Sequence, residues 1–177
     1  MVGMYALFWI FVIIFAVIGA TRGWAKEVMV TFSVILSIFL IVLMTTYVPY
    51  MKPDSEMSAS TRFYIQAGTV IIMAFFGYQT PKLPGLAGER FNRQKFQDAF
   101  LGLVIGALNG YLIVGTIWYY MNAANYPISF FISPDPDTEA GMAAINLLQN
   151  MPPTYLVPPW IYFAVALAFI FVVVVFI

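Results

Sequence analysis

Five apolar segments separated by polar stretches dominate the pattern along the chain. Each approaches or reaches the roughly 20 residues that a helix needs to cross the hydrocarbon of a bilayer. They cover residues 2–20, 28–48, 63–77, 100–120 and 160–177. Apolar runs of this length satisfy their backbone as helices, and no period-two alternation indicates a membrane barrel. The pattern predicts an all-α integral membrane protein: a single membrane domain, 1–177, built as a bundle of about five transmembrane helices.

A long polar loop, residues 121–159, separates the last two apolar segments and is broken repeatedly by proline. Within this loop the sequence predicts one amphipathic helix, 138–151, which Asp137 or Thr138 can cap. Its apolar face consists of Ala144, Leu147, Leu148 and Met151, opposite Asn146, Gln149 and Asn150. Two interpretations are open: an interfacial helix lying flat on the outer membrane surface, or a helix that covers the protein's own outer face.

Basic residues are distributed unevenly among the loops. The first and third loops together hold six Lys and Arg residues, whereas the second and fourth hold two. Short loops rich in Lys and Arg stay in the cytoplasm. This asymmetry predicts a multi-pass protein whose N-terminus lies outside, with an extracytoplasmic loop 121–159 and a cytoplasmic C-terminus.

Composition removes several classes of function. The chain is 62% hydrophobic and 9% charged, and its mean hydropathy is +0.88, which excludes a water-soluble domain. Its formal net charge is zero, so no basic surface for nucleic acid is expected. Histidine and cysteine are both absent, which removes the usual general base and the commonest ligands of zinc, copper, heme and iron–sulfur clusters. We therefore expect a protein that is not an enzyme and has no catalytic, cofactor-binding or metal site.

Glycines recur at four-residue spacing in the fourth apolar segment, at Gly102, Gly106 and Gly110. Residues four apart stack on one helix face, so this glycine ladder predicts a smooth groove where another helix approaches closely. Asp98 stands one turn before the groove, near the expected membrane boundary. The ladder therefore indicates helix packing rather than chemistry.

Three polar residues within the apolar segments are candidates for the same packing surface. Asn109 lies between two ladder glycines, where a buried amide usually forms hydrogen bonds across helices for about 0.6–2 kcal/mol. Ser33 and Ser37 stand four apart on the second segment and are small enough to face the glycine groove.

The first loop carries an interfacial polar motif: Arg22, Gly23, Lys26 and Glu27. In one interpretation Glu27 lies at the mouth of the bundle and pairs with Arg22 or a facing helix. In the other, the loop is a tight interfacial turn whose charged side chains reach to water. The third loop interleaves phenylalanine with Arg90, Arg93 and Lys95, a pattern that predicts contact with anionic lipid.

Two of these motifs together resemble the colicin V production protein family. The stretch Arg22-Gly-Trp-Ala-Lys-Glu27 after a first apolar helix is similar to one family signature. Asp98 leading into the glycine ladder is similar to a second, and the resemblance covers roughly residues 1–120. The chain departs from the pattern at Ala99 and Asn109, where the family often has basic residues, and the last loop and helix look like an extension. The resemblance implies a bacterial inner-membrane protein without established enzymatic activity, linked to toxin export, envelope homeostasis and biofilm formation.

Three functions follow from these observations. The first is a non-enzymatic bacterial integral membrane protein of this family, which acts through helix packing in envelope processes. The second is an accessory subunit of a larger respiratory or photosynthetic membrane complex, in contact with other membrane-protein subunits. The third, a small transporter or channel, is disfavoured because no charged residue lies within a predicted span. The expected partners are membrane lipids and other subunits, with possible lipid, carotenoid or quinone contact but no ligated cofactor.

Overall fold

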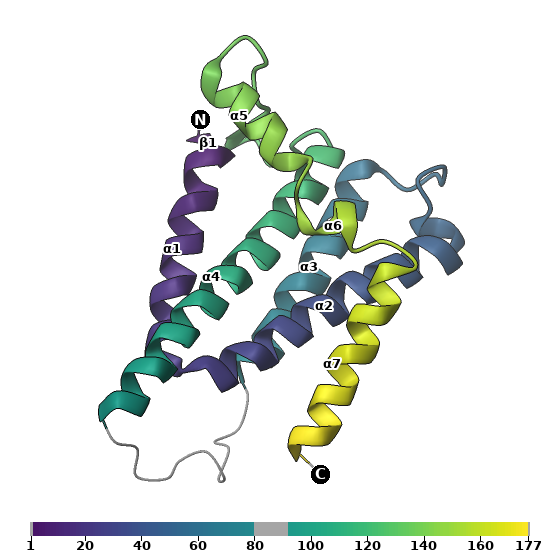
Figure 1. The fold of residues 1–177 in the computed structure, drawn as a ribbon. Helices are drawn as coiled ribbons and strands as arrows, with labels where there is room; N and C mark the ends of the chain where they lie inside the picture. The colour runs from purple at the N-terminus through teal and green to yellow at the C-terminus, as the bar shows by residue number, and fades with distance from the viewer. Residues whose placement is uncertain (1, 80–91, 177) are drawn as a thin grey trace.

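The computed structural model describes residues 2–79 and 92–176, and its regular structure is almost entirely helical. The long helices are α1 (Met4–Arg22), α2 (Trp24–Tyr47), α3 (Ala59–Tyr78), α4 (Asn92–Ala123) and α7 (Trp160–Phe176). They run in alternating directions along the chain (Figure 1). The N-terminus and the polar segment between α4 and α7 therefore lie at one end of the molecule. The turn between α1 and α2 and the C-terminus lie at the other.

Three helices of the described chain are long and apolar enough to cross a membrane: Met4–Arg22, Trp24–Tyr47 and Lys95–Ala123. The α7 segment is apolar but shorter, and α3 is outside this set. The structure thus shows an all-α membrane protein. Crossing of the membrane by all five long helices stays a prediction.

The first predicted loop is reduced to a single residue. Hydropathy placed residues 21–27 between two spans, whereas α1 continues to Arg22 and α2 begins at Trp24. Gly23 between them has φ +85°, a left-handed conformation that favours glycine, and its N–H donates to the Gly19 carbonyl at 2.9 Å. The charged residues of this motif therefore belong to helices, so the prediction that every charge lies between the spans is wrong.

The glycine ladder of α4 packs against α1. A Cβ atom on Gly102 or Gly106 would overlap the carbonyl oxygens of Gly19 and Phe15, and one on Gly110 would lie 2.9 Å from the Cα of Val12. These contacts bring the two helix backbones together along much of their length (Figure 1). Small residues allow this close approach in membranes, where dispersion and not water drives helix association.

The two serines of α2 do not face this groove. A Cβ atom on Gly77 of α3 would lie 2.7 Å from the Ser33 hydroxyl oxygen, so Ser33 lies against α3. The Ser37 hydroxyl is buried and donates to the Val34 carbonyl at 2.7 Å. The prediction for Ser33 is wrong because α1, and not Ser33 of α2, packs on the ladder glycines, whereas that for Ser37 stays a prediction.

A small cap covers the end of the molecule that holds the N-terminus. It contains β1 (Val2–Gly3), which pairs in parallel with β2 (Phe131–Ile132), and the helices α5 (Glu139–Leu148) and α6 (Pro152–Tyr155). Thr138 caps α5 by accepting from the Gly141 N–H at 3.0 Å. Gly141, Ala144 and Leu148 are buried, and α5 contacts α1 and α4. Of the two interpretations of this helix, the structure supports covering the protein's own outer face.

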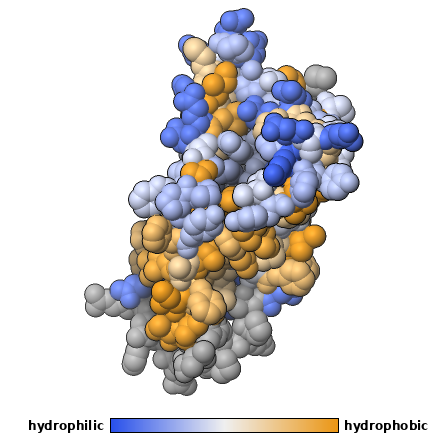
Figure 2. Space-filling model, turned by 90° about the vertical axis from the view of Figure 1, so that its right-hand side faces the viewer, coloured by the Kyte–Doolittle hydropathy of each residue, from blue (hydrophilic) through white to orange (hydrophobic). Residues whose placement is uncertain are grey.

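The surface changes character along the molecule. Figure 2 shows hydrophilic side chains gathered at its upper end and hydrophobic side chains over the face below. A short 3₁₀ helix, η1 (Pro49–Met51), and the Ser58 cap of α3 lie between α2 and α3. Ser58 accepts from the Thr61 N–H at 3.1 Å, which fixes the start of α3.

Candidate functional site

A buried ion pair lies where α1 ends and α2 begins. The Arg22 Nη1 atom donates to Glu27 Oε1 at 2.7 Å. The Glu27 side chain is 0% exposed and that of Arg22 is 20% exposed. Glu27 also lies in the first turn of α2, where the helix dipole favours a negative charge. The pairing corresponds to the first interpretation of this motif, and Arg22 does not simply extend into water.

The second carboxylate oxygen of Glu27 is bound from α4. Asn109 Nδ2 donates to Glu27 Oε2 at 2.8 Å and to the Glu27 carbonyl oxygen at 2.9 Å. The Thr31 hydroxyl donates to Asn109 Oδ1 at 2.7 Å and lies 3.1 Å from the Glu27 carbonyl. Asn109 is 0% exposed, so α2 and α4 are joined by a closed set of hydrogen bonds inside the bundle.

The third helix reaches the same place through Tyr78. Arg22 Nη2 donates to the Tyr78 carbonyl at 3.1 Å, at the C-terminal end of α3. The guanidinium carbon also lies 4.3 Å from the centre of the Tyr78 ring, within the range of a cation–π interaction. Arg22 is therefore held by a carboxylate, a helix C-terminus and an aromatic face. We call Arg22, Glu27, Thr31, Tyr78 and Asn109 the polar cluster.

Asp98 lies against the turn beside this cluster. A Cβ atom on Gly23 would lie 2.8 Å from Asp98 Oδ2, so the carboxylate packs directly on the glycine. The start of α4 thus meets the α1–α2 turn. The two sequence motifs, which are separated by two apolar segments along the chain, are brought together in space.

The cluster can hold four helices in register, and its carboxylate, guanidinium and amide groups bind one another. Both Glu27 carboxylate oxygens accept a hydrogen bond, and its charge is balanced by Arg22. Both oxygens of this carboxylate are therefore engaged by neighbouring helices. Arg22 and Glu27 lie in the last turn of α1 and the first turn of α2, at the ends of these two helices and not at their centres.

The remaining predicted residues lie at the same end of α4 as Asp98 or outside the described chain. Lys95 is exposed on the first turn of α4, and Lys26 is half-buried on α2. Arg90 and the side chain of Arg93 lie outside the described residues. The predicted lipid contact of Arg90, Arg93 and Lys95 therefore stays a prediction.

Sequence reasoning missed three contributors to these contacts: Thr31, Tyr78 and Gly77. Thr31 follows Glu27 by four residues and so shares its helix face, which is a usable signal. Tyr78 and Gly77 carried no signal, because their roles depend on where the end of α3 meets α1 and α2.

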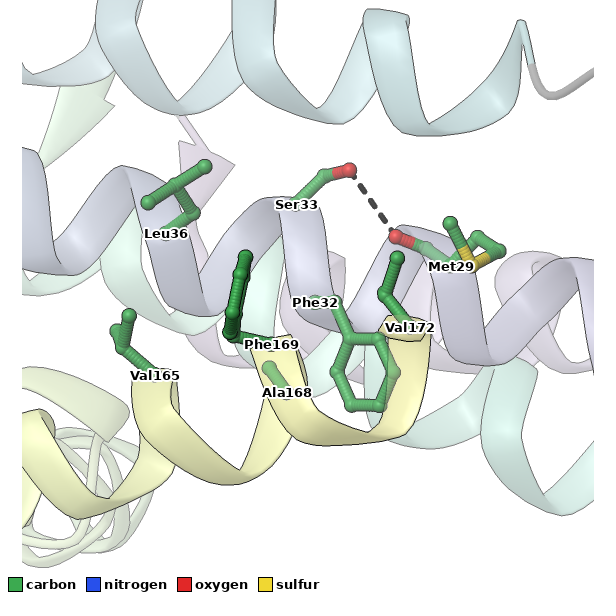
Figure 3. Close-up of a pocket in the computed structure, with 8 residues that line it drawn as sticks. All are labelled: Met29, Phe32, Ser33, Leu36, Val165, Ala168, Phe169 and Val172. Atoms are coloured by element: carbon green, nitrogen blue, oxygen red, sulfur yellow. Dashed lines mark hydrogen bonds between the residues drawn. The ribbon is translucent and has the colours of Figure 1, made fainter. Parts of the chain in front are cut away.

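A second feature is an apolar groove between α2 and α7. Two aromatic pairs hold these helices together, Phe32 with Phe171 at 5.2 Å and Phe39 with Tyr162 at 6.1 Å between ring centres. Beside the first pair lies a cavity of about 240 Å³ (Figure 3). It is lined by Met29, Phe32, Ser33, Leu36, Val165, Ala168, Phe169 and Val172. The Ser33 hydroxyl donates to the Met29 carbonyl at 3.0 Å, so the polar group of this lining is already engaged.

Together, the fold and the polar cluster define a helical integral membrane protein whose helices are joined by glycine packing and a buried ion pair. The model of one family, described as Colicin V production protein, matches residues 6–133. The chain belongs to this family, which confirms the resemblance in the two motifs and extends it from α1 to β2. No curated protein and no solved structure matches the chain.

Proposed function

We propose that this chain is a non-enzymatic, multi-pass protein of the bacterial inner (plasma) membrane that acts in envelope processes. It contacts other membrane components through its helix bundle and ligates no cofactor. The observation that carries this proposal is the closed polar cluster. Its carboxylate, guanidinium and amide form hydrogen bonds with one another and with the end of α3, so they fix the arrangement of α1, α2, α3 and α4.

The physics of buried ion pairs separates this structural role from a chemical one. Removing one partner of a buried pair leaves an uncompensated charge and costs about 3–5 kcal/mol, less where the partner is partly exposed as Arg22 is. Replacing both partners by apolar residues of similar volume is often neutral or stabilising. A structural cluster should therefore tolerate the double replacement, and a chemical one should not.

The test compares Arg22→Met, Glu27→Met and the double variant. We expect Arg22→Met to lose the most stability in detergent, because it strands the fully buried Glu27. The double variant should recover most of that loss. It should also restore the envelope or biofilm phenotype of a deletion strain. A stable double variant that fails to restore the phenotype would refute the proposal and assign the charges a direct role.

The proposal includes five membrane crossings with the N-terminus outside and the C-terminus in the cytoplasm. The alternating helix directions support it, because the N-terminus and residues 124–159 share one end of the molecule (Figure 1). Arg22, Lys26 and Lys95 lie at the ends of helices that meet at the opposite end, as expected for a cytoplasmic side.

One observation favours the second candidate, an accessory subunit of a larger respiratory or photosynthetic complex. Large apolar side chains are exposed along two outer faces, Ile13 and Val17 on α1 and Ile71 and Phe76 on α3. Lipid covers such faces in a stand-alone protein, and neighbouring subunits cover them in a complex. The groove between α2 and α7 has an apolar lining suited to a lipid, carotenoid or quinone tail.

Gentle extraction followed by mass spectrometry distinguishes these candidates. The accessory-subunit function predicts that a larger complex co-purifies in fixed stoichiometry in mild detergent. A monodisperse homo-oligomer free of other proteins favours the stand-alone protein.

Native mass spectrometry of the same sample would reveal a retained lipid, carotenoid or quinone. Replacing Ala168 by Phe, which fills the groove, should release it.

A further inference from the structure

The chain between α5 and α7 descends along α4. Gly115 lies eight residues before the end of α4, and a Cβ atom on it would lie 2.7 Å from the Met151 sulfur. One turn deeper, the Tyr111 hydroxyl donates to the Asn150 carbonyl. Tyr155 of α6 donates to the same Tyr111 oxygen at 3.2 Å. In Figure 1, α6 correspondingly lies below α5.

The depth of these contacts can be measured against α1. This helix has 19 residues, so it is about 28 Å long, close to the roughly 30 Å thickness of hydrocarbon. Arg22 marks one end, and Phe8 lies four residues after the other end, or about 6 Å along the axis. Phe8 contacts Tyr111 with ring centres 6.1 Å apart. Provided that α1 spans the hydrocarbon from end to end, as proposed above, the segment around Asn150 and Tyr155 reaches below its outer boundary.

Polar groups at this depth are exposed on the protein surface. Gln149 and Asn150 are exposed, and Tyr155 exposes 44% of its side chain. The backbone around Asn150 and Met151 is also not helical. Hydrocarbon does not tolerate such backbone and amide groups, which occur at membrane depth only where protein buries them or where they line a water-filled cavity.

A cavity of about 440 Å³ lies against this segment. It is lined by Tyr119, Asn122, Ile145, Leu148, Gln149 and Thr154, from α4, α5 and α6. A water molecule occupies about 30 Å³ of liquid and needs two to four polar partners, and this lining supplies amide and hydroxyl groups. The groove between α2 and α7, in contrast, offers water little to bind.

From these observations we propose that α4, α5 and α6 border a water-filled vestibule that opens at the N-terminal end of the molecule and extends to Thr154 of α6. Its lining carries amides and hydroxyls without a charged side chain, so it admits small neutral polar solutes and recognises them by hydrogen bonding. This inference is independent of the structural role of the polar cluster, since Asn109 and Tyr111 are two residues apart and face different sides of α4.

Cysteine labelling tests the vestibule directly, because the natural chain contains no cysteine. Thr154→Cys and Gln149→Cys place thiols in its wall beside the residues that bond to Tyr111, and Asn122→Cys marks its outer end, next to the last residue of α4. Ile10→Cys is the matched control. Ile10 lies beside Phe8 at similar depth on α1 and exposes half of its side chain. Labelling is carried out with a small membrane-impermeant thiol reagent on right-side-out and inverted vesicles, so the result does not depend on the orientation of the protein.

The vestibule variants should react at least about tenfold faster than Ile10→Cys, because a thiol in an apolar environment ionises less readily than one in water. Reaction should occur from one side of the membrane only. If the three variants react in detergent but not in membranes, lipid or a partner protein covers the segment and the proposal fails. Rapid reaction of Ile10→Cys would also refute it, because the reference depth would then lie outside the hydrocarbon.

Discussion

Glu27 is the buried carboxylate at the centre of the polar cluster. It accepts hydrogen bonds from α1 and α4, its backbone carbonyl accepts two more, and its charge is neutralised within the bundle. A carboxylate this well satisfied has little tendency to exchange partners. The consequence is positional: a single side chain fixes the end of α1, the start of α2 and the middle of α4 relative to one another.

The substitution Glu27→Gln isolates the charge from the shape. It keeps an oxygen acceptor but leaves Arg22 facing a neutral amide, and it adds an N–H group that competes with Asn109. Because hydrogen bonds to charged groups contribute about 1.5–3 kcal/mol, we expect a loss of that order in thermal or denaturant unfolding in detergent. Wild-type stability combined with lost activity in cells would mean that the charge acts in function and not in folding.

Among the helices, the contact between α1 and α4 is the tightest that the glycines reveal. Gly106→Ile would place a branched side chain where the backbone of Phe15 and Gly19 already lies. Overpacking typically costs about 1–3 kcal/mol, and backbone cannot move aside as a flexible side chain can. We expect reduced abundance and a lower melting temperature in detergent.

Leu108→Ile is the matched control for that substitution. Leu108 lies two residues away on the same helix but is partly exposed, and the change keeps the side-chain volume. It should unfold almost as the wild type does. Equal stability of Gly106→Ile and Leu108→Ile would show that the ladder is not an interface.

Runs of apolar residues predict the positions of the long helices well but not the residues at which they end. Apolar runs predict α1, α2, α3, α4 and α7 because membrane helices follow local hydropathy. Hydropathy predicts a loop over residues 21–27 because each charged residue lowers the local hydropathy. In the folded protein, however, the charges of Arg22 and Glu27 neutralise each other. A sliding window adds the two charges as separate penalties and therefore does not register that they pair.

The candidate site shows the same division. The sequence singles out Asp98, Asn109 and Glu27 because polar residues are uncommon in and beside apolar helices. Their partners could not be derived, because the crossing of α2, α3 and α4 decides which side chains meet. Ser33 shows the reverse case, in which a correct small-residue signal was assigned to the wrong neighbouring helix.

At the scale of the whole molecule, we expect the two ends of the helix bundle to face opposite sides of the membrane. Ser133 follows β2 in the cap, whereas Gln97 lies near the start of α4, at the opposite end. Both side chains are exposed. With the N-terminus outside, Ser133→Cys should label on intact cells with an impermeant thiol reagent, and Gln97→Cys only after lysis.

The reverse labelling pattern would invert the orientation. Labelling of both positions on intact cells, with a cytoplasmic marker protein unlabelled, would show that one of the five helices does not cross. Since α3 and α7 are the helices outside the set long and apolar enough to span, a miscount would be sought there first.

The one-residue turn at Gly23 has a consequence for how the protein is made. Of the first 47 residues, the charged ones are Arg22, Lys26 and Glu27, and the pair that bonds is separated by only five positions. The nascent hairpin of α1 and α2 can thus neutralise its buried carboxylate before Tyr78 or Asn109 has been synthesised. It can enter the bilayer as a unit with its internal charge already balanced. The later helices then assemble on a carboxylate whose position is set during translation.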